Sequence, residues 1–189
     1  MDQHGIDISV VRCACAKVQL PFNCVLKLFQ SSANPWLDFL SESNARSLAE
    51  TLNEDIEKYC EASPNLKGTS LKRIYGFGLL PLVPSVSTQA VVDTVEQVAK
   101  LPHLKGIIMG TKGVGKGLDD TDLEPVWEAL ERHQLVVFLH PHYGVGKSEW
   151  GPRENGHVLP LALGFPMETT IVSKTIVAFR RFIHFAFRR

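Results

Sequence analysis

Short apolar runs alternate with longer amphipathic segments along this chain. Four of the runs predict β-strands, at residues 6–11, 73–80, 106–110 and 135–139. None of these runs alternates apolar and polar residues in the way that a strand with one face in water does. We therefore expect strands that are covered on both faces.

Four amphipathic segments predict α-helices, and they cover residues 43–62, 87–101, 121–133 and 158–170. Ser43 or Asn44 is the expected cap of the first helix, and Thr121 or Asp122 is the expected cap of the third. The face of the first helix that should enter the core carries, at helical spacing, Leu48, Leu52, Ile56 and Tyr59.

Strands that alternate with helices at this spacing predict βαβ units and a parallel sheet, which places the chain in the α/β class. Four such units fit two architectures. One is an open, doubly wound sheet, and the other is half of an eight-stranded (β/α)8 barrel. The pattern alone does not choose between them.

Composition narrows the function classes but assigns no chemistry. The chain has 189 residues, enough for one domain with a core, and a net charge of zero, which argues against a nucleic-acid partner. None of the four cysteines stands in a CxxC pair, which favours reduced thiols in an intracellular protein. No apolar run approaches the length of a membrane span and the first residues do not resemble a signal peptide, so we expect a cytoplasmic protein.

The strand at residues 135–139 is followed directly by His140, Pro141 and His142. Pro141 cannot donate a backbone hydrogen bond, so the strand should end there and place both histidines at its carboxyl end. Ligands and metals bind at that end of the strands in parallel α/β folds, and a neutral imidazole is a ready metal ligand. The alternative is a hydrogen-bonded histidine of the core. Two histidines at one strand end favour a functional site.

Three further residues could contact a ligand or support one that does. Asn34 precedes a proline that holds it extended, so its amide could face a ligand; the alternative is an Asx turn. Arg153 lies in the long loop after the histidines and could bind a carboxylate, or it is solvated. Glu168 in the last helix could orient a ligating histidine, or it is an ordinary surface carboxylate.

A glycine-rich segment at residues 110–117 follows the third strand and resembles a phosphate cradle. Gly117 stands where a serine or threonine would hold magnesium, and the next helix begins several residues later, so we do not expect nucleotide binding. Two interpretations remain: a loop that brings Lys116 to a carboxylate substrate, or a glycine-rich turn with a solvated lysine. Three nearby acids, Asp119, Asp120 and Asp122, could form a metal cluster, but their place just before a helix favours acids at a helix N-terminus, and we assign them no chemistry.

Several motifs occur together, namely ANPW at 33–36, LLPL at 79–82, GIIMGT at 106–111, GKGLDD at 115–120, LHPHYG at 139–144 and GHVLPLALGFPMETT at 156–170. In these motifs the chain resembles the aminocarboxymuconate-semialdehyde decarboxylase family of the amidohydrolase superfamily, and the last two are the specific ones. The fungal branch that acts on 5-carboxyuracil, and relatives that act on salicylate-type acids, are the most similar in these motifs.

The resemblance implies a partial, truncated (β/α)8 barrel of about four βα units. Residues 1–171 would be the middle part of a metal-dependent decarboxylase barrel. Residues 12–30, which interrupt the family pattern, would be an insertion or a retained intron. Residues 172–189 would form a basic amphipathic tail outside the family pattern, and we do not expect that tail to bind a membrane.

The family holds Zn²⁺ or another divalent metal, and His140 matches one of its metal ligands. Asn34 matches a loop that faces the substrate, and Arg153 is a second candidate for substrate binding. The family's other ligands and its catalytic histidine have no match in this chain, so no catalytic residue is assigned.

The reaction that the resemblance implies is metal-dependent, non-oxidative decarboxylation of a small aromatic or heterocyclic carboxylate, with a homodimer as the expected assembly. The alternative function is a non-catalytic binding or regulatory fragment that pairs with a full-length relative.

Overall fold

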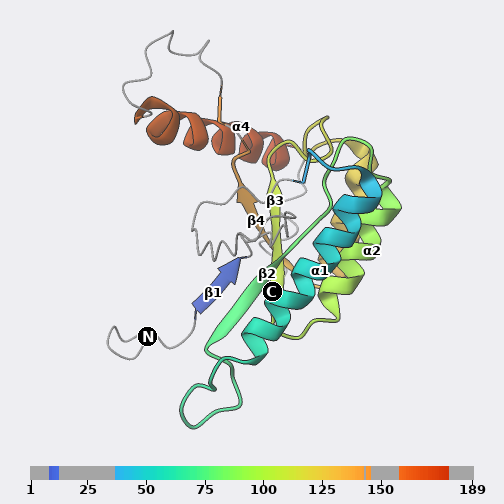
Figure 1. Ribbon diagram of the computed structural model, residues 1–189. Coiled ribbons are helices and arrows are strands. Elements are labelled where there is room, and N and C mark those ends of the chain that lie inside the picture. Colours follow the sequence, from blue (N-terminus) through green and yellow to red (C-terminus); the bar gives the residue numbers. More distant parts are fainter. Residues whose placement is uncertain (1–8, 13–36, 143, 146–157, 179–189) are drawn as a thin grey trace, which may run out of the picture.

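Figure 1 shows the computed structural model of the chain, which describes residues 9–12, 37–142, 144–145 and 158–178. The strands are β1 (Ser9–Arg12), β2 (Ile74–Leu79), β3 (Leu104–Gly110) and β4 (Val136–His140). The α-helices are α1 (Glu42–Glu61), α2 (Thr88–Ala99), α3 (Glu124–Arg132) and α4 (Phe165–Ala178). A short 3₁₀ helix, η2 (Thr121–Leu123), precedes α3, and a π-helical turn, η4 (Pro160–Gly164), precedes α4.

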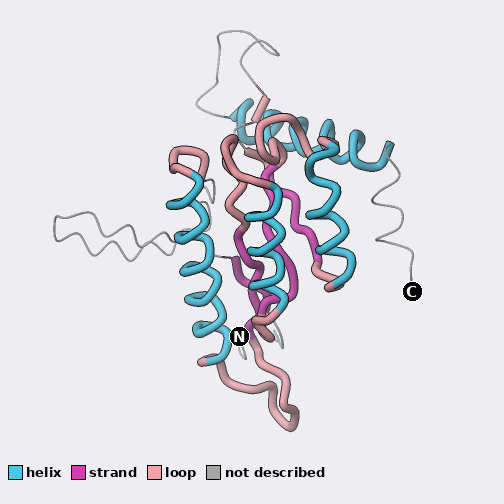
Figure 2. Tube along the Cα trace, turned by 90° about the vertical axis from the view of Figure 1, so that its right-hand side faces the viewer, coloured by secondary structure: helices cyan, strands magenta, loops and turns pink. Residues whose placement is uncertain are grey.

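The four strands form one parallel sheet in the order β1-β2-β3-β4. Helices α1, α2 and α3 lie side by side over one face of this sheet (Figure 2), and α2 contacts both α1 and α3. A doubly wound sheet reverses its strand order at a switch point and carries helices on both faces. Sequential strand order with the connecting helices on one face is the arrangement of a barrel. The structure therefore confirms the α/β class and identifies the fold as part of a (β/α)8 barrel.

The main core lies between the sheet and the helix layer and consists of buried aliphatic side chains, chiefly from α2, α3 and β3. Gly76 and Gly78 in β2 face this layer. A Cβ atom on Gly76 would lie 2.4 Å from Ile56 Cγ2, and one on Gly78 would lie 2.7 Å from Val98 Cγ2. The two missing side chains therefore let α1 and α2 pack close to β2.

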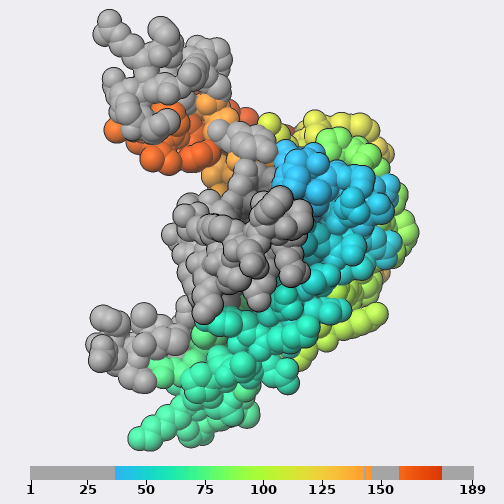
Figure 3. All heavy atoms as spheres, viewed as in Figure 1, coloured from blue at the N-terminus to red at the C-terminus, as the bar shows by residue number. Residues whose placement is uncertain are grey.

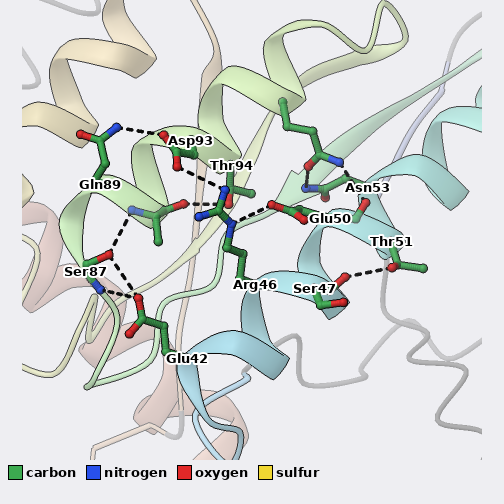
Figure 4. A network of polar contacts seen from close by, with 12 residues as sticks. Glu42, Arg46, Ser47, Glu50, Thr51, Asn53, Ser87, Gln89, Asp93 and Thr94 are labelled. Atoms are coloured by element: carbon green, nitrogen blue, oxygen red, sulfur yellow. Dashed lines mark hydrogen bonds and ion pairs between the residues drawn. The ribbon is translucent and has the colours of Figure 1, made fainter.

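Polar side chains join α1 to α2 at the outer edge of the core (Figure 4). Ser87 caps α2 by accepting a hydrogen bond from the amide of Ala90. The carboxylate of Glu42 in α1 accepts hydrogen bonds from the amide and hydroxyl of Ser87, at 3.2 and 3.1 Å. Arg46 in α1 forms an ion pair with Asp93 in α2 at 3.2 Å. These contacts fix the two helices side by side.

Asn53 in α1 is fully buried and binds the backbone of β2 at both of its polar atoms. Its Nδ2 donates to the carbonyl oxygen of Leu79 at 3.0 Å, and its Oδ1 accepts from the amide of Leu79 at 2.6 Å. Nδ2 also lies 3.3 Å from Oε1 of Gln97 in α2. One side chain thus ties α1 and α2 to the carboxyl end of β2.

Helix α1 confirms the first predicted helix, but its cap and its buried face differ from the prediction. Ser41, and neither Ser43 nor Asn44, occupies the cap position, and its side chain makes no capping hydrogen bond. Tyr59 is half exposed because the buried stripe of α1 runs one residue further on, through the fully buried Cys60.

The third and fourth helices also begin differently. Asp120 is the cap of η2, because its carboxylate accepts from the amide of Asp122 at 3.1 Å, while Thr121 lies within η2 itself. The helix predicted at residues 158–170 is present, but it contains the π-helical turn η4 and continues to Ala178.

The prediction that every strand is covered on both faces is wrong for β4. Val136 and Phe138 are 52% and 41% exposed, whereas Val137 and Leu139 pack against the core. The difference follows from the alternation of side chains along a strand, because α1, α2 and α3 cover only one face of the sheet. On the other face, Phe138 stacks on Phe77 of β2 with ring centroids 5.8 Å apart.

Several predicted features lie outside the described residues. They are the start of the first strand, most of the proposed insertion at residues 12–30 with three of the four cysteines, and the tail beyond Ala178. The fourth cysteine, Cys60, is a free and buried thiol, and burial raises its pKa to about 11. Of the helices that the structure describes, none is long and apolar enough to span a membrane.

Candidate active site

The carboxyl ends of β3 and β4 meet α4, which crosses that end of the sheet (Figure 1) and projects away from the body formed by α1 and α2 (Figure 3). Five polar residues gather here, and we call them the strand-end cluster: Asp38, Thr111, His140, His142 and Glu168. Substrates bind at this end of the strands in (β/α)8 barrels, so the cluster is the candidate active site.

His140 is the last residue of β4 and is partly exposed. Its Nδ1 lies 2.8 Å from the carbonyl oxygen of Pro141, and a carbonyl can only accept, so Nδ1 carries a proton. In the neutral ring the electron pair is then on Nε2, the atom that could bind a metal. The imidazole ring also packs against the ring of Phe138 in a T-shaped arrangement, with the ring centroids 6.1 Å apart. Both rings lie on the face of the sheet that the helices leave uncovered.

His142 is the buried member of the histidine pair, with 8% of its surface exposed. Its Nε2 lies 3.1 Å from Oδ2 of Asp38, a residue that precedes α1. The two histidines therefore differ in role. His142 matches the hydrogen-bonded core histidine that the sequence left open as an alternative, and His140 is the one placed for a ligand.

Glu168 extends from α4 to the ends of both neighbouring strands. Its Oε1 accepts hydrogen bonds from the hydroxyl of Thr111, after β3, and from the amide of His142 at 2.8 Å, after β4. Its Oε2 accepts from the amide of Gly144. Glu168 is thus no free surface carboxylate, and it contacts the histidine segment through the backbone rather than through an imidazole ring.

The described residues do not form a complete metal site. No group of three or more histidine, cysteine, aspartate or glutamate side chains among them could hold a metal ion. His140 has the chemistry of one ligand, but a catalytic zinc site needs about three from the protein. The described residues therefore fit a metal ion only in part.

Lys116 in the glycine-rich segment is exposed and paired with acids of its own chain. Its Nζ lies 2.9 Å from Oδ2 of Asp122 and 3.6 Å from Oδ2 of Asp120. The hydrogen bond to Asp122 and the charge of Asp120 raise the pKa of Lys116. This geometry favours the glycine-rich turn over a lysine presented to a substrate, since nearby carboxylates already compensate its charge.

An open pocket of about 730 Å³ adjoins the cluster between the histidine segment and α4. It is mostly apolar, and its lining includes Pro141, Leu161 and Phe165 together with the charged Lys174. Its volume lies within the range of small-molecule sites.

Two of the predicted site residues, Asn34 and Arg153, lie outside the described residues and remain predictions. Sequence reasoning missed Thr111 and Asp38. The position of Thr111 directly after a strand is a signal that could have identified it. Asp38 stands 104 residues from His142 and is brought to it only by the fold.

Comparisons with known proteins agree with this geometry, although no protein-family model matches the chain. The chain is 32% identical over 128 residues to the 2-amino-3-carboxymuconate-6-semialdehyde decarboxylase of Dictyostelium discoideum, which is 68% of this chain and 32% of that protein. The crystal structure of Metarhizium anisopliae IDCase in apo form matches at 42% identity and a TM-score of 0.72, over 94% of this chain and 40% of that one.

A second similar structure is a 5-carboxyvanillate decarboxylase of Novosphingobium aromaticivorans, complexed with manganese and 4-hydroxy-3-methoxy-5-nitrobenzoic acid. It matches with a TM-score of 0.60 at 21% identity, over 78% of this chain and 38% of that one, and so supports the fold. This chain spans 32% of the curated relative and 40% of the IDCase chain. From the sequence identity and the shared barrel topology together, we conclude that the chain belongs to the decarboxylase family of the amidohydrolase superfamily.

Proposed function

We propose that this chain carries the His140 segment of an active site for non-oxidative decarboxylation of an aromatic or heterocyclic carboxylic acid. The observation that supports this proposal most is the position of His140 at the carboxyl end of β4, with Nδ1 bound to the carbonyl of Pro141. Decarboxylation breaks the bond between the ring and the carboxylate carbon, releases CO₂, and replaces it with a proton. The adjoining pocket of about 730 Å³ has the volume for such a substrate.

A divalent metal, Zn²⁺ or another such as the manganese of the 5-carboxyvanillate decarboxylase, belongs to this proposal. Bound metal would stabilise the negative charge that develops as CO₂ leaves. His140 would supply one ligand, and the remaining ligands do not come from the described residues. Because the family's other ligands have no match in the sequence of this chain, we expect this chain alone to bind the metal weakly.

A metal-binding experiment tests the role of His140. Mn²⁺ is titrated into the purified chain and free Mn²⁺ is followed by electron paramagnetic resonance. His140→Ala should remove the binding that the wild type shows. His133→Ala is the matched control, because His133 directly follows α3 and pairs with Glu96, and it should leave binding unchanged. Equal binding by the wild type and His140→Ala would contradict the assignment.

An activity assay tests the reaction. CO₂ release from carboxyl-labelled 5-carboxyuracil and salicylate is measured with Zn²⁺ or Mn²⁺ present. Metal-dependent release that His140→Ala removes would support decarboxylation by this chain. Absence of release from a chain that binds Mn²⁺ through His140 would refute turnover by this chain and favour the second candidate.

The second candidate is a non-catalytic fragment that pairs with a full-length relative. The exposed Val136 and Phe138 favour it, because they present apolar surface on β4, at the edge of the sheet, where another chain could pack. Size-exclusion chromatography with light scattering, with and without a full-length relative, separates the outcomes. A mixed complex supports pairing, and a monodisperse monomer in both runs contradicts it.

A further inference from the structure

One peptide group connects Glu168 to His140. The carbonyl oxygen of Pro141 accepts from His140 Nδ1 at 2.8 Å, and the amide of His142 donates to Glu168 Oε1 at 2.8 Å. That carbonyl and that amide belong to the same peptide bond, between Pro141 and His142. Because a peptide group is planar, fixing the direction of its N–H also fixes the direction of its C=O.

The carboxylate also affects the strength of the second hydrogen bond. A negative charge at the N–H end of a peptide group polarises it and makes its carbonyl oxygen a better acceptor. The chain of contacts from Glu168 through the peptide to His140 Nδ1 therefore favours the tautomer with its proton on Nδ1. A carboxylate that binds a metal-ligating histidine directly fixes the tautomer in the same way, and here a peptide group stands between the two.

The position requires two accepting oxygens. Oε1 accepts from Thr111 and His142, and Oε2 accepts from Gly144. Glutamine has the same shape but only one accepting oxygen, so its NH₂ group must face at least one of these donors. Glu168→Gln therefore breaks part of the arrangement at nearly constant volume.

We propose that Glu168 is a positioning residue for His140, acting through the Pro141–His142 peptide to hold the Nδ1–H tautomer, which puts the electron pair of the neutral ring on Nε2. The use of that electron pair rests on the proposed function, whereas the tautomer does not. His142 is held separately by Asp38, at 3.1 Å from its ring, so the fold should survive the loss of Glu168.

Nuclear magnetic resonance measures the tautomer directly, without any metal. Long-range ¹H–¹⁵N spectra of the full chain are recorded at about pH 8, where an ordinary imidazole is neutral. Wild-type His140 should be mainly the Nδ1–H form. In Glu168→Gln the ratio of the Nδ1–H to the Nε2–H form should fall by about fivefold, the size of effect expected for one hydrogen bond. Thr170→Ala on the same helix is the control, since Thr170 donates only to Pro166 within α4, and it should change nothing.

Amide exchange gives a second readout that shows whether the contact itself is lost. Glutamine keeps one accepting oxygen, so at least one of the two amides, that of His142 or that of Gly144, should exchange at least about tenfold faster in Glu168→Gln. Glu168→Ala removes both acceptors, so both amides should exchange faster in that variant and the His140 tautomer should shift with them. Faster exchange of the His142 amide with an unchanged His140 tautomer would overturn the proposal, because the contact would then be structural only. An Nε2–H tautomer in the wild type would overturn it even if the variant failed to fold. Failure of the proposed function would appear instead as Mn²⁺ binding that does not depend on His140.

Discussion

Asn53→Ala removes a buried side chain that serves two backbone groups at once. Asn53 and Leu79 are both buried, at 0% and 3% exposure, and their two hydrogen bonds measure 2.6 and 3.0 Å. Alanine supplies neither the donor nor the acceptor, and water has little access to the site. The amide and carbonyl of Leu79 thus lose this partner in a buried place where water cannot replace the two hydrogen bonds.

The magnitude follows from the two groups. An unsatisfied buried donor or acceptor costs about 1–3 kcal/mol, so the pair sets a range of about 2–6 kcal/mol. We expect a loss of about 3 kcal/mol in the free energy of unfolding. This value lies in the lower half of the range because the residues around the smaller alanine side chain can shift and partly satisfy the freed backbone groups. Asn53→Asp should be no better, since it turns a carboxylate oxygen toward the carbonyl of Leu79.

Urea unfolding followed by circular dichroism measures the effect. Asn44→Ala is the matched control, an exposed asparagine on the same helix, and it should change the free energy by less than about 0.5 kcal/mol. The reasoning would be refuted if Asn53→Ala cost less than about 1 kcal/mol at an unchanged denaturant slope. A changed slope would show instead that the variant altered the compactness of one of the two states.

Three further changes test other parts of the structure. The raised pKa of Cys60, about 11 against an ordinary 9.0, should give stability that is complete below about pH 9 and is lost toward pH 11, about 2–3 kcal/mol in all. Lysines such as Lys116 also titrate in this range, so urea midpoints should decline more steeply in the wild type than in Cys60→Ala. Partial burial raises the pKa of Glu96, but the hydrogen bonds and charges of Arg132 and His133 together outweigh it, and the pKa is lowered. The stabilisation is therefore present above about pH 4.5 and lost as the pH falls, so Glu96→Gln should lower the melting temperature at neutral pH and not at pH 3. Gly106→Ala would place a Cβ atom 2.1 Å from the carbonyl oxygen of Val136, so it should separate β3 from β4 and abolish the cooperative thermal unfolding transition. A normal unfolding transition in this variant would contradict the observed register.

Local signals were enough to predict the elements, because each depends on nearby residues. The apolar run before Pro141 predicted β4, and Ser87 marked the start of α2. The choice between a doubly wound sheet and a barrel needed the strand order, which is a property of the tertiary structure. The exposure of Phe138 could not be predicted either, since it depends on which face of the sheet the helices cover.

In the candidate site, too, the features set by neighbouring residues could be predicted and those set by the tertiary structure could not. The histidine pair was visible because a strand, a proline and two imidazoles are adjacent in the sequence. The difference between the two histidines was not visible, because the partner of His142 is Asp38, 104 residues away. Glu168 was predicted from the sequence as a residue that could orient a ligating histidine. Its contact with the backbone amide of His142 could not be predicted, because that contact depends on how α4 lies across the strand ends.

The π-helical turn η4 before α4 has a consequence for how this segment tolerates change in length. In this turn the amide of Phe165 bonds to the carbonyl of Pro160, five residues back, so the turn holds one residue more than an α-helix would. Each residue rotates an α-helix by about 100°. A one-residue deletion within η4 would restore ordinary helical spacing and swing Glu168 by that angle away from the strand ends, while every side chain of α4 stayed the same. Chain length in η4, and not only residue identity in α4, therefore determines which side chain of α4 faces the strand-end cluster.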